Sequence, residues 1–496
     1  MPACSVFWFR RDLRLKDNAG LQAALAGTRP VLPLFILDSD ILDTLPADDS
    51  RVAFLFAVLR QLQLDLQELG SGLLVLRGRP AEVWQWLPGV VQAAEVHANR
   101  DYEPYAQQRD DAITCLLSER GIPFALHKDS LLFEPEEILK ADGSPYTVYT
   151  PYSRRWLQRL LDTGIGGGVG DSPRLGGRPR AGGSQVQGGV RPQASGTGFP
   201  GGVRPHGGFV GFSGGRPAGW TERLVPNGFS WVGSTELAAT AAAPAAKPVP
   251  PWSLSGVDQY HATRDFPALD SGSYLGPHLR FGTVNIRHIL RQLFTEAADG
   301  SSSSGNIDGS LGPGRECFLG ELIWREFFTQ ILYHFPQSAA ANFKRKYDGV
   351  HWRKDASAFA AWTEGRTGFP LVDAGMRQLR ATGSMHNRVR MVCASFLCKD
   401  LLLDWRQGEA WFAAQLLDYE QSSNVGNWQW SAGTGCDAAP YFRIFNPIEQ
   451  QKRWDPQLDY VKRWIPEYGS AEYPKPIVDH AAARQRALAA YKAALG

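Results

Sequence analysis

The period of the hydrophobic pattern changes once along this chain, and the change separates an α/β part from an all-helical part. In residues 1–133, short apolar runs that fit buried strands alternate with segments that fit helices. The strand-like runs are 4–9, 31–37, 73–76, 95–98 and 124–127, and the helical segments are 18–26, 51–69, 80–88 and 104–119. Strands that alternate with helices are typical of βαβ units in a parallel sheet. Residues 1–133 are therefore predicted to form a Rossmann-like α/β domain.

The second half of the chain has almost no strand-like alternation. Amphipathic helical segments follow one another there with short connections. We expect helices near 283–296, 315–333, 356–363, 370–381, 385–404, 407–416 and 481–495, with a small polar insertion over 298–314. A large all-α domain is therefore predicted over 252–496, in agreement with a chain of 496 residues that is too long for one core.

Residues 134–251 are predicted to connect the two domains. Within them, 21 of the 56 residues between 164 and 219 are glycine, and Gly-Gly-Val-Arg-Pro or Gly-Gly-Arg-Pro repeats begin at Gly188, Gly201 and Gly214. Six arginines and no acidic residue occur between 172 and 221. Such a segment cannot bury enough apolar surface to fold, so we expect a disordered basic linker. It is either a tolerated insertion or a source of weak, salt-dependent phosphate contacts.

Composition restricts the possible partners. The formal net charge is +2, so binding to nucleic acid would need a local basic face rather than a global field. The six cysteines form no CxxC pair and no cluster with histidine, which predicts no metal site and reduced thiols inside a cell. No apolar run approaches the roughly 20 residues that cross a bilayer, so we expect a soluble protein without a membrane partner.

Polar groups and indoles crowd together between Ser384 and Pro447. The stretch contains Met385–Met391, Asp418-Tyr419-Glu420 and Asn424–Trp430, and nine of the 16 tryptophans lie between 324 and 464. Amides, carboxylates and arginines are unfavourable to bury among apolar rings unless each finds a hydrogen-bond partner. Because a flat polar heterocycle would supply those partners, the stretch predicts a cofactor pocket.

These segments resemble the photolyase/cryptochrome family, and most closely the class I cyclobutane pyrimidine dimer (CPD) DNA photolyases. The N-terminal run Phe7–Asn18 and the Glu-Leu-Ile-Trp-Arg-Glu-Phe run that begins at Glu321 are further hallmarks of the family, and the resemblance covers nearly the whole chain apart from the glycine-rich insertion. It implies that the helical domain binds FAD. The implied activity is light-driven repair of CPDs in DNA, by electron transfer from excited, reduced FAD.

The resemblance also implies which residues hold FAD. Arg390 and Asp418 would pair against the pyrimidine-like end of the flavin, Glu420 would face its N3 edge, and Asn424 would accept a hydrogen bond from a protonated N5. The phosphate loop of the family corresponds to residues 272–276, where Gly-Ser-Tyr-Leu-Gly replaces the usual Thr-Ser-x-Leu-Ser and lacks two hydroxyl groups. The implied cofactor-binding set is Tyr260, Gly272, Ser273, Tyr274, Leu275, Gly276, Phe318, Glu321, Arg325, Asn387, Arg390, Asp418, Glu420 and Asn424.

The DNA lesion is expected to bind beside the flavin. In the family, the residue that matches Glu321 hydrogen-bonds a pyrimidine, and those that match Trp324 and Trp430 stack on the dimer. Asn387 and Met391 stand where (6-4) photolyases carry two histidines, which favours a CPD substrate. The implied DNA-binding set is Arg264, Glu321, Trp324, Asn387, Arg388, Met391, Trp430 and Arg443.

Three tryptophans match an electron relay of the family. Trp428, Trp405 and Trp352 correspond to the indoles that carry an electron from the surface to the oxidised flavin. With Glu321 and Asn424 they complete the predicted catalytic set. Taken singly, each indole would be assigned to core packing, and only the three matching positions together indicate a relay.

A second, light-harvesting chromophore is expected at the N-terminal domain. The folate-binding branch has Glu where this chain has Ala106, and Cys-Lys where it has Ser338-Ala339. A folate antenna is therefore not expected, whereas a deazaflavin, another flavin or an empty cleft stay open. Ser384 stands where most relatives have Trp beside the flavin helix. We expect a monomer whose partner is dimer-containing DNA.

Two other functions stay open from the sequence. The first is a cryptochrome-type blue-light photoreceptor without repair activity, against which Asn424 argues because plant cryptochromes typically carry Asp there. The chain also stops soon after its last predicted helix, without the long C-terminal extension of many cryptochromes. The second is a flavoprotein oxidoreductase without photochemistry, but no nicotinamide-binding GxGxxG motif is present.

Overall fold

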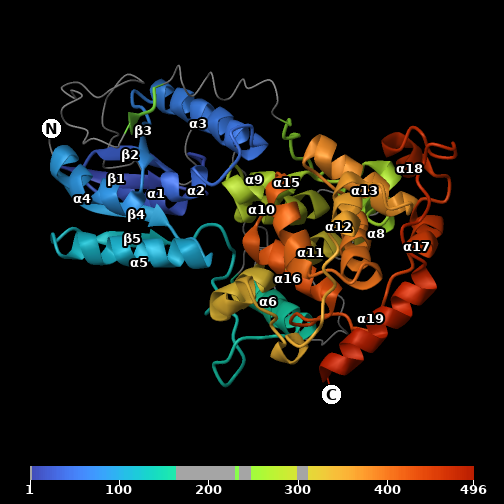
Figure 1. Cartoon of the computed structure of the whole chain (residues 1–496). Helices are drawn as coiled ribbons and strands as arrows, with labels where there is room; N and C mark the ends of the chain where they lie inside the picture. The colour runs from blue at the N-terminus through green and yellow to red at the C-terminus, as the bar shows by residue number, and fades with distance from the viewer. Residues whose placement is uncertain (1–2, 164–229, 234–246, 299–310, 496) are drawn as a thin grey trace, which may run out of the picture.

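The computed structural model describes residues 3–163, 230–233, 247–298 and 311–495. These residues form an α/β part and a helical part that lie side by side (Figure 1). The predicted glycine-rich linker over 164–219 and most of the predicted polar insertion over 298–314 lie outside the described residues. Among the described residues, every helix is too short or too polar to span a membrane.

The α/β part is built on one sheet in the order β5-β4-β1-β2-β3-β6. The strands are β1 (Cys4–Phe9), β2 (Val31–Asp38), β3 (Leu74–Gly78), β4 (Ala93–Asn99), β5 (Phe124–His127) and β6 (Ser230–Trp231). The first five are parallel, as the alternating pattern predicts, and β6 adds an antiparallel edge to β3. With only two residues, β6 carries no alternation that sequence analysis could detect.

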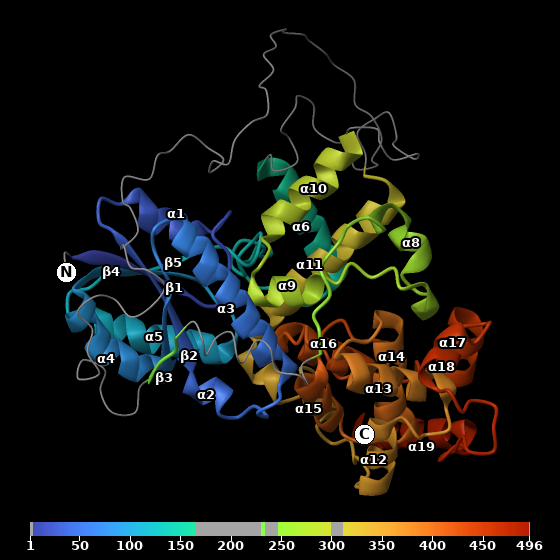
Figure 2. The same ribbon diagram turned by 90° about the horizontal axis from the view of Figure 1, so that it is seen from above.

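Helices cover both faces of the sheet (Figure 2). They are α1 (Ala19–Ala26), α2 (Ser39–Leu42), α3 (Ser50–Glu68), α4 (Pro80–Val91) and α5 (Pro104–Ser118). Successive side chains of β1 point to opposite faces. Val6 and Trp8 therefore pack with α4 and α5, whereas Phe7 and Phe9 pack with α1 and α3. The predicted Rossmann-like α/β fold is confirmed.

The rest of the described chain is helical, apart from loops, so the predicted all-α second part is also confirmed. Its helices are α6 (Tyr149–Thr163), α8 (Tyr260–Thr263), α9 (Leu275–Phe281), α10 (Ile286–Ala298), α11 (Pro313–His334), α12 (Ala356–Glu364), α13 (Pro370–Thr382), α14 (Asn387–Ser395), α15 (Trp405–Gln415), α16 (Gln421–Ala432), α17 (Pro447–Trp454), α18 (Asp459–Trp464) and α19 (His480–Leu495). Sequence analysis did not separate α16, α17 and α18, which are rich in polar residues.

The helix predicted over 385–404 is shorter than expected. The α-helix ends at Ser395 and continues as a π-helical segment, Phe396–Asp400. A new helix then starts at Trp405, because the side chain of Asp404 accepts the backbone N–H of Arg406 and caps it. A π-helical turn changes which side chains face the core, and such turns often occur at functional sites.

Helix α6 is the largest element that sequence analysis missed, since residues 130–160 looked like a connecting segment. It packs in the helical part, as both views show. Tyr152, Trp156 and Leu160, spaced four residues apart, are its buried face. Trp156 Nε1 donates to Glu326 Oε2 at 2.6 Å, which ties α6 to α11. Burial of that carboxyl group raises the pKa of Glu326.

Candidate functional site

Helices α14, α15 and α16 enclose a polar pocket in the helical part. About 560 Å³ between them is free of protein atoms. The lining contains six of the predicted cofactor and DNA residues, namely Asn387, Arg390, Met391, Asp418, Glu420 and Asn424, together with Trp428. The crowded polar stretch of the sequence therefore folds around one pocket, as its composition indicates.

Arg390 and Asp418 form the expected ion pair at one wall of this pocket. Arg390 Nη2 lies 2.9 Å from Asp418 Oδ2, and Arg390 Nε donates to the Met385 carbonyl at 2.7 Å. Asp418 Oδ1 is buried and has no hydrogen-bond partner among the described residues. Buried carboxylate oxygens are rarely left unpaired, so this atom is suited to accept an N–H or O–H of a bound flavin nucleotide.

Gly276 explains one departure from the usual phosphate loop. A Cβ atom at this position would lie 2.9 Å from Asp418 Oδ2 and 2.8 Å from Asp418 Cβ. A serine at this position would therefore press on the carboxylate that Arg390 holds. Glycine at 276 and the position of Asp418 are linked, because the close approach leaves no space for a side chain.

Asn424 is oriented by a buried carboxyl group. Its Nδ2 donates to Glu409 Oε1 at 2.9 Å and to the Glu409 carbonyl at 3.2 Å. Both amide hydrogens are thus used, which leaves Asn424 Oδ1 as a hydrogen-bond acceptor in the pocket. Burial raises the pKa of Glu409, which sequence analysis did not select. The arrangement fits the predicted role of Asn424 as an acceptor for flavin N5–H.

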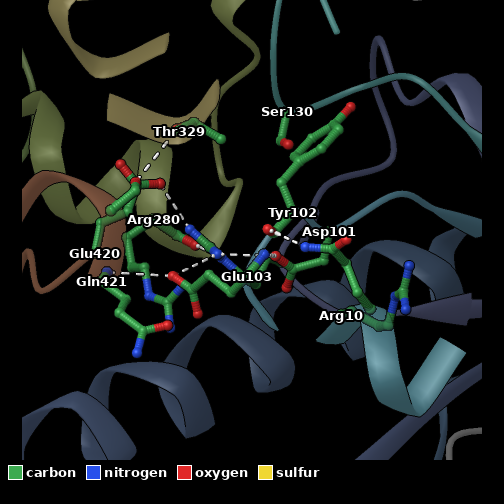
Figure 3. A network of polar contacts seen from close by, with 12 residues as sticks. Arg10, Asp101, Tyr102, Glu103, Ser130, Arg280, Thr329, Glu420 and Gln421 are labelled. Atoms are coloured by element: carbon green, nitrogen blue, oxygen red, sulfur yellow. Dashed lines mark hydrogen bonds and ion pairs between the residues drawn. The ribbon is translucent and has the colours of Figure 1, made fainter. Parts of the chain in front are cut away.

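Glu420 makes contacts that sequence analysis did not anticipate. Its carboxylate accepts from Arg325 Nε and Nη2 at 3.0 and 2.9 Å, and from Arg11 Nη2 at 2.8 Å. Burial alone would raise the pKa of Glu420, but the charges of Arg325, Arg11 and Arg280 outweigh it and lower the pKa to about 2. The group joins the segment that follows β1 to α9, α11 and the residue that precedes α16. Figure 3 shows Arg280 and Glu420 within this network of polar contacts.

A second cavity of about 480 Å³ lies beyond Glu420, between the two parts of the molecule. It opens at the carboxyl ends of β1 and β4, where the strand order reverses and where α/β folds commonly bind ligands. Arg11 bridges Asp101 and Glu103 there at 3.2 and 3.1 Å, and Arg280 contacts Glu103 at 3.0 Å. The cavity is a candidate site for a second ligand.

A third cavity, of about 540 Å³, lies beside the predicted phosphate loop. Four predicted cofactor residues line it: Tyr260, Gly272, Ser273 and Phe318. Ser253, Ser255 and Ser271 also line it, and they were not selected from the sequence. The Ser253 N–H donates to the Ser273 carbonyl at 3.0 Å and joins the two segments. The hydroxyls of Ser253, Ser255 and Ser271 can replace the two that the loop lacks.

The two remaining residues of the predicted phosphate loop do not line this cavity. Leu275 is buried, and the hydroxyl of Tyr274 donates to Asp270.

Four of the eight predicted DNA-binding residues lie in a second polar group beside α11. Glu321 Oε1 lies 2.6 Å from Arg264 Nη1, and burial raises the pKa of Glu321 even with this partner. Trp324 is one turn further along the helix and half-buried. Arg388 pairs with Asp265 at 2.6 Å, one residue beyond Arg264. The structure therefore brings Glu321, Trp324 and Arg264 together.

The other predicted DNA residues are more dispersed. Asn387 and Met391 share the pocket-facing side of α14, four residues apart, as predicted. His386 caps that helix, since its Nδ1 accepts the Arg388 N–H, and burial lowers the pKa of His386 to about 4. Trp430 is half-buried on α16, and Arg443 is exposed in the loop that follows that helix.

The three tryptophans predicted to form a relay differ in their burial. Trp428 lines the pocket and is buried, Trp405 is buried with its Nε1 donating to Asn342 at 2.9 Å, and Trp352 is half-buried. The Trp428 ring lies against Gly408, which is one turn from Trp405 on α15. Sequence analysis did not select Trp362, whose ring centroid is 6.1 Å from that of Trp428.

Comparisons with known proteins agree with this geometry. Residues 5–167 match a family described as DNA photolyase, and 318–472 match the FAD binding domain of DNA photolyase. A deoxyribodipyrimidine photo-lyase from Halobacterium salinarum is 36% identical, with 99% of both chains covered. A class III photolyase structure from Agrobacterium tumefaciens has a TM-score of 0.75 and 32% identity, and covers 100% of this chain and 98% of its own. A Sulfolobus tokodaii photolyase solved with two FAD molecules has a TM-score of 0.73 and 29% identity, and covers 99% of both chains.

A helical flavin pocket beside a Rossmann-like domain defines the photolyase/cryptochrome class of flavoproteins. This chain belongs to the DNA photolyase family, and its helical part is the FAD-binding domain. The family and the FAD cofactor predicted from the sequence are thereby confirmed. Membership of class I stays a prediction, because a class III structure is among the similar ones.

Proposed function

We propose that this protein is a deoxyribodipyrimidine photo-lyase that repairs cyclobutane pyrimidine dimers in DNA with the energy of blue or near-UV light. When bound, reduced FAD supplies an electron to the dimer on excitation and takes it back after the ring has split. The observation that carries the proposal is the fixed amide of Asn424. Because Glu409 holds both of its N–H groups, its carbonyl is the acceptor that a reduced flavin, protonated at N5, requires.

Other residues of the pocket hold and orient the cofactor. Arg390 fixes Asp418, whose free Oδ1 would accept a hydrogen bond from the flavin. Tyr260, Ser273 and the neighbouring serines would bind the diphosphate through hydroxyl and backbone donors. Glu420 holds Arg325 rather than reaching freely into the pocket, so we propose that it supports the site through that arginine.

The lesion would bind against α11 and α14. With its pKa raised, Glu321 retains a proton more readily and can donate a hydrogen bond to a pyrimidine carbonyl. Trp324 offers an apolar ring for stacking, worth about 1–3 kcal/mol per base, which helps offset flipping the dimer out of the helix. Asn387 and Met391 would border the dimer, and Arg264, Arg388 and Arg443 would bind phosphates.

Trp428, Trp405 and Trp352 would conduct electrons from the surface to the pocket and keep the cofactor reduced. Trp428 and Trp405 are both buried and Trp352 is half-buried, so the three indoles together can reach from the pocket toward solvent. We also propose an antenna chromophore in the cavity at β1 and β4. Ala106 and Ser338-Ala339 offer none of the carboxylate, thiol or amine groups of the folate branch, so a flavin or deazaflavin fits better.

Within the family we propose class I membership and a monomer that acts on DNA inside the cell. The absence of two histidines at Asn387 and Met391 supports the CPD substrate. All six cysteines are free, which suits a reducing compartment.

A blue-light repair assay on photoreduced protein tests the proposal. The two substrates are oligothymidine with cyclobutane dimers and the same strand with (6-4) lesions. We expect light-dependent repair of the cyclobutane substrate alone, and loss of that repair in Glu321→Ala with FAD retained. Repair of neither lesion by protein with photoreducible FAD would refute the proposal and favour a cryptochrome-type photoreceptor.

A further inference from the structure

An aromatic ring from outside the predicted site covers one face of Trp324. Tyr149, the first residue of α6, lies parallel to the Trp324 ring, with the ring centroids 3.6 Å apart and an interplanar angle of 2°. The other ring neighbours of Trp324 are Phe327, which meets it edge-on, and Phe328, whose ring is offset at 5.4 Å and inclined by 28°. The face of Trp324 that Tyr149 covers is therefore already stacked, and a base would have to stack on the part of the ring that Tyr149 and Phe328 leave uncovered.

Polar contacts fix the Tyr149 ring in this position. Its hydroxyl donates to the Gly320 carbonyl at 2.9 Å, and its backbone N–H donates to Asp437 Oδ2 at 3.0 Å. Gly320 lies on α11, one turn before Trp324, whereas Asp437 lies in the loop after α16 that also carries Arg443. Tyr149 thus joins three separate pieces of chain behind the indole. Because both its backbone and its hydroxyl are hydrogen-bonded, we expect the Tyr149 ring to stay against Trp324 when a base binds rather than to be displaced by the base.

We propose that Tyr149 is a positioning residue for the lesion: it fixes the plane of Trp324 so that a flipped pyrimidine dimer meets a preformed stacking surface. Preformed binding surfaces gain affinity because less side-chain freedom is lost on binding. The inference rests on the proposed place of Trp324 in the lesion pocket. It gives α6, which is far from the FAD-binding segments in the sequence, a role in recognising damage.

The test measures binding of FAD-loaded protein to oligothymidine with one cyclobutane dimer and to the undamaged strand, by fluorescence anisotropy. We expect Tyr149→Leu to weaken dimer binding by about 2- to 10-fold, the range for loss of one aromatic pair, and to change binding to undamaged DNA by less than about 2-fold. Tyr149→Phe keeps the ring and should restore dimer binding. Tyr333→Leu is the matched control, since Tyr333 also lies at a helix surface with one hydroxyl contact but is not stacked on Trp324.

A double-mutant cycle separates the positioning role of Tyr149 from the stacking role of Trp324. If Tyr149 acts through Trp324, Tyr149→Leu has no further effect in a Trp324→Leu background. Unchanged dimer binding in Trp324→Leu alone would refute the proposed place of Trp324. Weaker dimer binding in Trp324→Leu but not in Tyr149→Leu would refute only the positioning role.

Three further results would overturn the inference. The first is an equal loss of affinity for damaged and undamaged DNA in Tyr149→Leu. The second is additive losses of dimer affinity in the double variant. The third is tighter dimer binding in Tyr149→Leu, which would show that the Tyr149 ring occupies the place of a base. If Tyr149→Leu does not fold, Asp437→Ala replaces it, because that change frees the Tyr149 N–H and keeps the ring. Its readout is the ratio of dimer to undamaged affinities, which should fall, and an unchanged ratio would refute the inference.

Discussion

Replacing Glu420 with glutamine should destabilise the protein in a manner that depends on pH. The carboxylate accepts three hydrogen bonds from Arg325 and Arg11, and its pKa falls from 4.5 to about 2. At about 1.4 kcal/mol for each unit of pKa, this difference corresponds to about 3 kcal/mol of folding free energy at neutral pH. Glutamine has the same shape but supplies no charge to the arginines.

The pH window follows from the direction of the change. Because the folded-state pKa of Glu420 lies below the unfolded value, the stabilisation is complete above pH 4.5 and is lost as the pH falls toward 2. The difference in unfolding free energy between wild type and Glu420→Gln should therefore be about 3 kcal/mol at pH 7 and about 1 kcal/mol at pH 3.

Urea unfolding at pH 7 and pH 3, followed by tryptophan fluorescence, measures both values. Glu449→Gln is the control, because Glu449 pairs with Lys452 at 2.8 Å on the exposed surface of α17 and should contribute about 0.5 kcal/mol or less. The reasoning fails if Glu420→Gln costs no more than the control. It also fails if its cost is the same at both pH values.

Three other changes test the pocket and the relay. Gly408→Ala would place a methyl group 2.2 Å from the nearest atom of the Trp428 ring, which is closer than contact distance. We expect about 1–3 kcal/mol lower stability, measured by thermal unfolding, and slower photoreduction of bound FAD, measured by bleaching of the oxidised flavin. Gly276→Ser should weaken FAD binding, because its Cβ would lie 2.9 Å from Asp418 Oδ2; titration of apoprotein with FAD would contradict this if affinity were unchanged. Trp352→Phe should abolish photoreduction by external donors but leave repair intact in protein reduced with dithionite, and normal photoreduction would remove Trp352 from the relay.

The fold could be predicted wherever the hydrophobic period was unambiguous. Helix α3 and helix α13 match the expected segments to within one residue at each end, because their apolar stripes are regular. Helix α6 was missed because its buried residues, Tyr152, Trp156 and Leu160, are separated by arginines and follow a polar turn. The π-helical segment 396–400 was missed because its sequence does not differ in pattern from that of a buried α-helix. The wider turn is set by packing, which the sequence does not show.

The residue types of the site could be predicted from the sequence, but many of the hydrogen bonds and ion pairs between them could not. Residues close in sequence, such as Asn387 and Met391, lie on one face as their spacing indicates. Glu420 is different, since one of its partners, Arg11, is 409 positions away and no local pattern can select it. Tyr149 was missed for the same reason, because its ring partner lies on another helix.

Helix α16 connects the interface between the two parts of the molecule to the electron relay. Glu420 precedes its first residue and binds Arg11 of the α/β part, Asn424 lines the pocket with its side-chain N–H groups held by Glu409, and Trp428 is the first indole of the predicted relay. These three residues are spaced by four, so they lie along one face and span about 12 Å. A helix of this length tilts as a unit. We therefore expect a change in how the α/β part holds Glu420 to move Asn424 and Trp428 together, so that Arg11, which does not itself line the pocket, helps set the pocket geometry through Glu420.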